Sequence, residues 1–144
     1  MLVIGGSLGA RTINESVLQG IDKLTGAGLQ VIWQTGKGFF SGVRDLVESM
    51  AGRGVCIREF IQRMDLAYAS ADLVVSRAGA SSVSELSIVG KPSILMPSPN
   101  VAEDHQTKNA MALVGKKAAL LVNDQEAAGK LIPEVIRLDR KSTR

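Results

Sequence analysis

Six short apolar runs alternate with stretches of helical apolar spacing along the whole chain. A buried parallel strand is apolar throughout, whereas a helix covering it is apolar along one stripe. The alternation therefore predicts an α/β fold with a doubly wound, parallel, six-stranded, Rossmann-like sheet. The predicted strands are 2–4, 29–34, 55–59, 73–76, 93–96 and 118–122, and the predicted helices are 10–24, 41–50, 63–69, 82–89, 104–114 and 125–138.

Length and composition predict a single domain over residues 1–144, because no linker, repeat or low-complexity tract interrupts the pattern. No apolar stretch approaches the roughly 20 residues that cross a bilayer, and no signal-like segment opens the chain, so we expect a cytoplasmic location. The first residues already belong to a core strand, and the last helix runs into a basic end. We therefore expect the chain to be a piece of a longer protein, truncated at its C-terminal end.

The charge distribution argues against nucleic acid as a partner. The net charge of +3 is concentrated in residues 137–144, and aromatic residues make up 3% of the chain, too few for a stacking platform. Cys56, the single cysteine, is expected to be a small buried residue of the third strand.

Loops that follow the strands carry the polar motifs, and in open parallel sheets these loops form the ligand-binding rim. Residues 5–10 (GGSLGA) join the first strand to the first helix. Glycines there let the backbone approach a phosphate closely, and Ser7 adds a hydroxyl. A tight turn without a ligand explains the same residues.

Residues 76–85 (SRAGASSVSE) are the most informative motif, because they join the fourth strand to a predicted helix. Free N–H groups and the positive end of the helix dipole make such a turn an anion site, and its serines add donors. The alternative is a capping box, in which the Ser82 hydroxyl and the Glu85 carboxylate satisfy backbone N–H groups of the same helix.

Two further motifs lie on the rim. Residues 59–64 (EFIQRM) end the third strand, where free backbone groups can read the edge of a planar base, although closure of the core by Phe60 and Met64 is the simpler interpretation. Residues 103–110 (EDHQTKNA) place His105, Gln106 and Asn109 at the start of a helix, and amides suit sugar hydroxyls because they both donate and accept. No cysteine pair, histidine cluster or Asp-x-Asp indicates a metal or a cofactor.

In this order and spacing, these four motifs resemble the C-terminal half of the bacterial peptidoglycan glycosyltransferases, which transfer N-acetylglucosamine from UDP-N-acetylglucosamine to lipid I to form lipid II. The resemblance implies one half of a GT-B fold, the half that binds the UDP-sugar donor. It implies a metal-independent, inverting hexosyltransferase without a cofactor, UDP-N-acetylglucosamine being a co-substrate.

Position by position, the resemblance implies that the backbone of Ile61 binds uracil and that Glu85 holds both ribose hydroxyls. The residues implied to meet the diphosphate are Ser7, Ala80, Ser81 and Ser82. The residues implied to face the sugar are His105, Gln106 and Asn109. Other members carry a larger residue and threonine at 81–82, and some carry glutamine at 105.

The catalytic residues stay unknown, because no side chain here is a persuasive general base. The resemblance implies that the base, the lipid I site and the contact with the cytoplasmic face of the inner membrane belong to an N-terminal half that this chain lacks. We therefore expect the chain alone to be inactive. Two alternatives remain open: half of a nucleotide-sugar 2-epimerase, and a non-catalytic α/β nucleotide-binding module.

Overall fold

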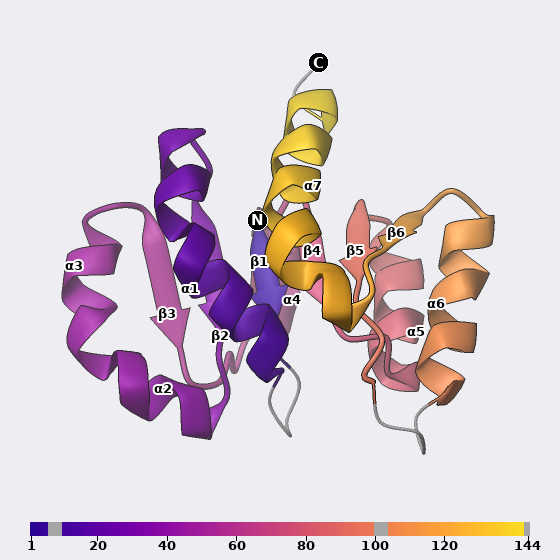
Figure 1. The fold of residues 1–144 in the computed structure, drawn as a ribbon, viewed down its shortest axis with the longest axis horizontal. Helices are drawn as coiled ribbons and strands as arrows, with labels where there is room; N and C mark the ends of the chain where they lie inside the picture. The colour runs from indigo at the N-terminus through magenta and orange to yellow at the C-terminus, as the bar shows by residue number, and fades with distance from the viewer. Residues whose placement is uncertain (6–9, 100–103, 143–144) are drawn as a thin grey trace.

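The computed structural model describes residues 1–5, 10–99 and 104–142. Its sheet has six strands, parallel in every pair, in the order β3-β2-β1-β4-β5-β6 (Figure 1). The strands are β1 (Leu2–Ile4), β2 (Val31–Gln34), β3 (Val55–Arg58), β4 (Val74–Ser76), β5 (Ser93–Leu95) and β6 (Ala119–Leu121). Each lies within its predicted range, and the prediction of a doubly wound, parallel, six-stranded sheet is confirmed.

Helices connect each strand to the next. They are α1 (Arg11–Gly26), α2 (Lys37–Val43), α3 (Val47–Ala51), α4 (Met64–Ser70), α5 (Ala80–Val89), α6 (Asp104–Gly115) and α7 (Ala127–Ser142), with the 3-10 turns η1 (Arg44–Leu46) and η3 (Asp124–Glu126). None of these helices, within the ranges described above, combines the length and apolar character of a membrane-spanning segment.

The prediction of one helix over 41–50 was wrong. The chain instead forms α2, η1 and α3, beginning directly after Gly36, whose φ is 78°. The ring of Phe39 lies 5.8 Å from the ring of Trp33, which is fully buried in β2. Because Phe39 packs on Trp33, the helix begins earlier, at Lys37. Helical spacing alone does not reveal this tertiary contact.

The two faces of the sheet are covered by different helices. In Figure 1, α1 and α7 lie in front of the sheet, and their apolar stripes form one core with Trp33 at its centre. The helices α4, α5 and α6 form a second core on the other face, around Leu2, Tyr68 and Leu86. Both cores rest on the central strands, whose residues are buried on either side.

The edge strand β3 is covered on one face only. Val55 and Ile57 are buried, whereas Cys56 and Arg58, which alternate with them, are exposed. The prediction that Cys56 is buried was therefore wrong. The helices α4, α5 and α6 leave the Cys56 face of β3 uncovered. The sequence of a strand does not show whether a helix will cover a given face.

The strand order reverses between β1 and β4, which are neighbours in the sheet. From β1 the chain winds outward through β2 to β3, and from β4 it winds the other way through β5 to β6. In sheets of this kind, ligands bind beyond the carboxyl ends of the strands at such a switch point. The turns after β1 and β4 are therefore the first place to look for a site.

Candidate functional site

A buried polar network supports the turn after β1. Asn14 of α1 donates its amide to the carbonyl of Thr35 at 2.9 Å, and the indole of Trp33 donates to Asn14 Oδ1 at 2.9 Å. A Cβ at Gly5 would lie 3.2 Å from the carbonyl oxygen of Gln34, so glycine permits the close approach of these backbones. These contacts fix Gly5 at the end of β1. Ser7, the predicted diphosphate contact, lies outside the described residues.

The turn after β4 leads directly into α5. The helix begins at Ala80, earlier than the predicted Ser82, with Gly79 at the N-cap and no side-chain cap. Its first internal hydrogen bond runs from the Val83 N–H to the Gly79 carbonyl at 2.9 Å. The N–H groups of residues 80–82 therefore precede the helical ladder, which is the arrangement of an anion site.

The capping-box interpretation of Ser82 and Glu85 was wrong. Because α5 starts two residues earlier, Ser82 lies inside its first turn instead of at the N-cap. The Glu85 carboxylate does not cap the helix: its Oε2 accepts a hydrogen bond of 2.9 Å from the hydroxyl of Tyr68 in α4. Glu85 lies three and four residues beyond Ser82 and Ser81, so the three side chains share one side of the helix.

An open groove of about 510 Å³ separates α4 from α5 next to Glu85. Its walls include Met64, Tyr68, Glu85 and Ile88. Tyr68 is 7% exposed and belongs to the second core, whereas Glu85 is exposed. Burial and the neighbouring Glu85 carboxylate raise the pKa of Tyr68 above its usual value, so the hydroxyl keeps its proton and stays a donor.

The predicted base contact lies on the loop that enters α4. Ile61 is half-buried and packs against the second core, the same cluster that Val83 of α5 joins. Its backbone N–H donates to Gln34 Oε1 at 2.9 Å. A base that takes this N–H would have to displace the Gln34 carboxamide. The role of Ile61 in binding uracil stays a prediction.

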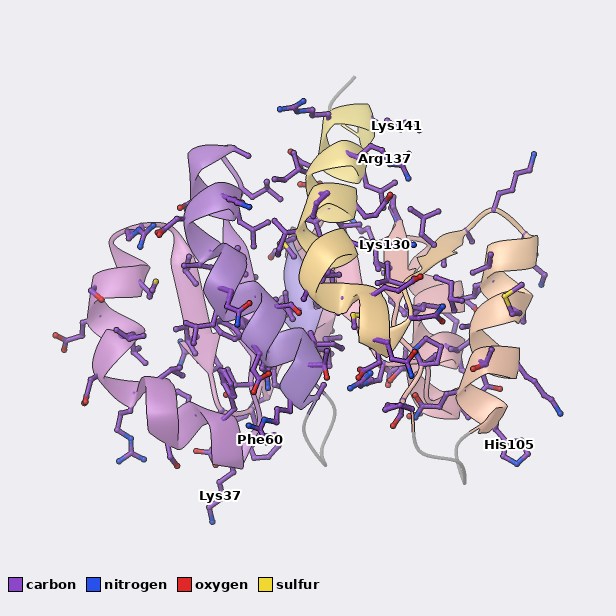
Figure 2. All side chains as sticks on the ribbon, viewed as in Figure 1. Lys37, Phe60, His105, Lys130, Arg137 and Lys141 are labelled. Atoms are coloured by element: carbon purple, nitrogen blue, oxygen red, sulfur yellow. The ribbon has the colours of Figure 1, made fainter. Side chains whose placement is uncertain are left out.

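The three predicted sugar contacts lie on the first turns of α6. Figure 2 shows His105 projecting at the same edge of the molecule as Phe60, the edge formed by the carboxyl ends of the strands. Gln106 Oε1 accepts the backbone N–H of Ser98 at 2.9 Å, and Asn109 donates its amide to the carbonyl of Ala78 at 3.2 Å. The Asn109 bond joins α6 to the turn before α5, so the predicted sugar and diphosphate contacts lie side by side.

A salt bridge behind this rim links the turns that follow β4 and β5 to η3 and to α1. Arg77, in the turn between β4 and α5, pairs with Asp124 at 2.5 Å, and each side chain is 15% exposed. Arg77 also donates to the carbonyls of Met96 and Pro97, both at 3.3 Å, while Asp124 accepts the hydroxyl of Thr12 at 2.9 Å. Loss of one partner from a partly buried pair of this kind destabilises the fold. The network therefore holds the turn after β4 in place.

Sequence reasoning missed the supporting residues of the site. Arg77 and Asp124 are 47 residues apart, Tyr68 and Glu85 are 17 apart, and Gln34 and Ile61 are 27 apart. No local pattern signals such pairs. The single usable signal was Tyr68 itself, the one tyrosine of the chain, set among small residues of α4.

No group of three His, Cys, Asp or Glu side chains is arranged to hold a metal ion within residues 1–5, 10–99 and 104–142. The predicted site residues that the structure describes at the rim offer backbone donors, hydroxyls, amides and the Glu85 carboxylate. Such groups suit phosphate oxygens and sugar hydroxyls.

An open parallel sheet with a helix N-terminus, hydroxyls and a carboxylate at its switch point defines an α/β domain suited to phosphate esters of sugars or nucleosides. The model of the glycosyltransferase family 28 C-terminal domain matches residues 1–144. The chain belongs to this family, and the resemblance drawn from its motifs is confirmed.

Two relatives that are more than 50% identical to the chain carry the same name. The chain is 54% identical over 138 residues to a UDP-N-acetylglucosamine--N-acetylmuramyl-(pentapeptide) pyrophosphoryl-undecaprenol N-acetylglucosamine transferase of Parabacteroides distasonis. It is 53% identical over 138 residues to the enzyme of that name from Cytophaga hutchinsonii. The alignments cover 96% of this chain but 38% and 36% of the two relatives, so the chain spans less than two-fifths of their length.

A solved structure is similar over nearly the same extent. The crystal structure of Acinetobacter baumannii MurG matches 99% of this chain and 40% of its own, with a TM-score of 0.66 and 30% identity. A glycosyltransferase of kitacinnamycin, at 17% identity and a TM-score of 0.57, shares the fold. The prediction of one half of a GT-B fold is confirmed by the match to MurG.

Proposed function

We propose that the chain is the donor-binding half of an inverting glycosyltransferase, which moves N-acetylglucosamine from UDP-N-acetylglucosamine to lipid I to give lipid II in peptidoglycan synthesis. The observation that carries the proposal is the position of α5. Its first turn lies at the switch point of the sheet, with Ser81, Ser82 and Glu85 on one side of the helix. The names of the relatives favour a transferase over a 2-epimerase or a non-catalytic module.

The proposed donor site has three parts along the rim. The nucleoside lies between the loop at Ile61 and Glu85, the diphosphate at the N–H groups of residues 80–82, and the sugar at His105, Gln106 and Asn109. Asn109 reaches the turn at Ala78, which supports neighbouring diphosphate and sugar positions. Glu85 supplies carboxylate oxygens for ribose hydroxyls, which are donors as well as acceptors.

The proposed reaction is displacement at the anomeric carbon by the acceptor hydroxyl, with UDP as the leaving group. Negative charge grows on the diphosphate as the bond breaks. The N–H donors and dipole of α5, with the hydroxyls of Ser81 and Ser82, are fixed where that charge develops, so they stabilise the transition state more than the ground state. In this proposal the chain uses neither a metal nor a cofactor.

The acceptor half of the reaction is assigned to a part outside this chain. The relatives are more than twice as long, which leaves room for a second domain that holds lipid I, the general base and a surface for the cytoplasmic face of the membrane. The location proposed for the full-length protein is therefore peripheral, on the cytoplasmic side. The chain alone is expected to bind donor without turnover.

Calorimetric titration of the chain with UDP tests the proposal. The Glu85→Ala variant is expected to bind UDP about 10- to 100-fold more weakly, because hydrogen bonds to a charged group contribute about 1.5–3 kcal/mol. Its melting temperature should fall by a few degrees at most, since Glu85 is exposed and only the hydrogen bond from Tyr68 is lost.

The matched control is Glu48→Ala, which removes an exposed carboxylate from α3, away from the rim. It should leave UDP affinity unchanged. A parent chain without affinity for UDP, or a Glu85→Ala variant that binds UDP as the parent does, would refute the proposed site.

A further inference from the structure

We propose that Tyr68 is a positioning residue that holds the Glu85 carboxylate in the orientation needed to accept ribose hydroxyls, and thereby sets the preference of the site for a ribonucleotide over a 2′-deoxyribonucleotide. The inference rests on the proposed function, because it concerns the nucleoside part of the donor site. It adds a residue from α4 to a site otherwise built on α5, α6 and the loop at Ile61.

The contact itself is well defined. The Tyr68 hydroxyl donates to Glu85 Oε2 at 2.9 Å across the α4–α5 groove. Tyr68 is 7% exposed, and its ring packs in the second core with Ala67 and Leu86. A buried ring cannot follow the carboxylate, so the carboxylate must come to the hydroxyl.

Glu85 without this bond would be a mobile side chain. It lies on an exposed helix surface, and a glutamate there loses considerable rotamer freedom when a ligand fixes it. The hydrogen bond from Tyr68 restricts the Glu85 rotamers before the ligand binds. Preorganisation of this kind raises affinity because less entropy is lost on binding.

The bond leaves acceptor capacity for the ligand. An ionised carboxylate offers about four lone-pair sites, of which the Tyr68 hydroxyl occupies one. The groove contains a second carboxylate, Asp65, but it accepts two hydrogen bonds from Arg63, at 3.0 and 2.8 Å. Glu85 therefore accepts from a hydroxyl, whereas Asp65 is paired with a cation.

Tyr68 can only donate in this arrangement. Burial, and then the Glu85 carboxylate, raise the pKa of the phenol above its usual value, so the proton stays on the tyrosine. A phenylalanine at 68 would keep the packing of the ring and remove this donor alone.

The test compares UDP with 2′-deoxy-UDP by calorimetry on the whole chain. The parent is expected to prefer UDP by about tenfold, the value of one hydrogen bond to a charged group. In Tyr68→Phe the affinity for UDP should fall several-fold while that for 2′-deoxy-UDP changes less, so the ratio of the two shrinks. Ser87→Ala, which removes a hydroxyl bonded to the Val83 carbonyl of α5, should leave both affinities and their ratio unchanged.

A second measurement keeps the inference testable if Tyr68→Phe folds poorly. Tyr68 is the one tyrosine of the chain, so its ring gives a single, assigned set of NMR signals. UDP should shift these signals, and 2′-deoxy-UDP should shift them less.

The outcomes separate the two proposals. If the parent binds neither nucleotide, the donor site fails and the role of Tyr68 fails with it. If UDP binds and Glu85→Ala weakens it, but Tyr68→Phe folds and keeps the parental ratio, the donor site stands and the positioning role is refuted. For a poorly folded variant, equal shifts of the Tyr68 ring with both nucleotides would refute that role.

Discussion

The two faces of the sheet differ in how completely helices cover them. On the α1 and α7 face, the five strands β1 to β5 contribute buried residues, β6 contributes the partly buried Leu120, and Trp33 is fully enclosed. On the other face the cover stops short of the β3 edge, where Cys56 and Arg58 are exposed, and Phe60 and Leu66 beside them are 51% and 54% exposed. We call the face under α1 and α7 the closed face and the opposite face the open face. The closed face provides stability, and the open face leaves side chains free to meet a ligand or another part of a longer protein.

The largest effect is expected from truncating the centre of the closed face. Trp33→Ala removes a fully buried ring and the partner of Asn14 Oδ1, and should lower the free energy of unfolding by about 3–5 kcal/mol. Urea denaturation followed by circular dichroism measures it. The matched change on the open face is Phe60→Ala, which should cost less than about 1 kcal/mol because half of that ring is already in solvent. Equal costs would show that the two faces do not differ as described.

An intermediate effect is expected from pH at the α4–α5 groove. Burial and Glu85 raise the pKa of Tyr68 in the folded chain, so the native state holds this proton more tightly than the unfolded chain does. The resulting contribution to stability is present below about pH 10, the usual tyrosine pKa, and is lost as the pH rises from there towards the native value. Tyrosinate absorbance measures the pKa directly, since Tyr68 is the one tyrosine.

The Glu85→Gln variant sharpens this prediction. It removes the charge but not the burial, so the pKa of Tyr68 should fall part of the way towards its usual value. A tyrosine that titrates in the folded parent as it does in urea would show that the Tyr68 hydroxyl is not held by Glu85.

The smallest effect is expected at Cys56 on the open face. Cys56→Ser should change the free energy of unfolding by no more than about 0.5 kcal/mol, because the side chain is exposed. Reaction of the thiol with a water-soluble reagent should also be rapid in the folded chain. Protection of Cys56 from the reagent, or a large loss of stability in Cys56→Ser, would place it in a covered core.

The strands were predictable from sequence because each is a local apolar run, and a buried parallel strand needs nothing else to be recognised. The start of α5 was predicted two residues late, since Gly79 and Ala80 carry no capping side chain to mark it. Exposure of Cys56 was missed because it depends on where α4 lies. The first error therefore reflects an absent local signal, and the second reflects tertiary packing.

The residues of the candidate site also differ in whether local sequence could predict their role. The positions of Ser82 and Glu85 near the switch point could be predicted, because they follow from chain order and from the strand that precedes α5. Their supports, Tyr68 and the Arg77–Asp124 pair, come from distant segments and became visible only in the fold.

The most direct test of the donor site is backbone NMR of the chain during titration with UDP. We expect the largest shifts at residues 80–85, followed by the loop at Ile61 and the Tyr68 ring. In Glu85→Ala the same shifts should require about 10- to 100-fold more UDP. Shifts confined to the opposite end of the sheet would rule out a nucleotide site at the N-terminus of α5. Equal shifts at equal UDP concentrations in the parent and in Glu85→Ala would do the same.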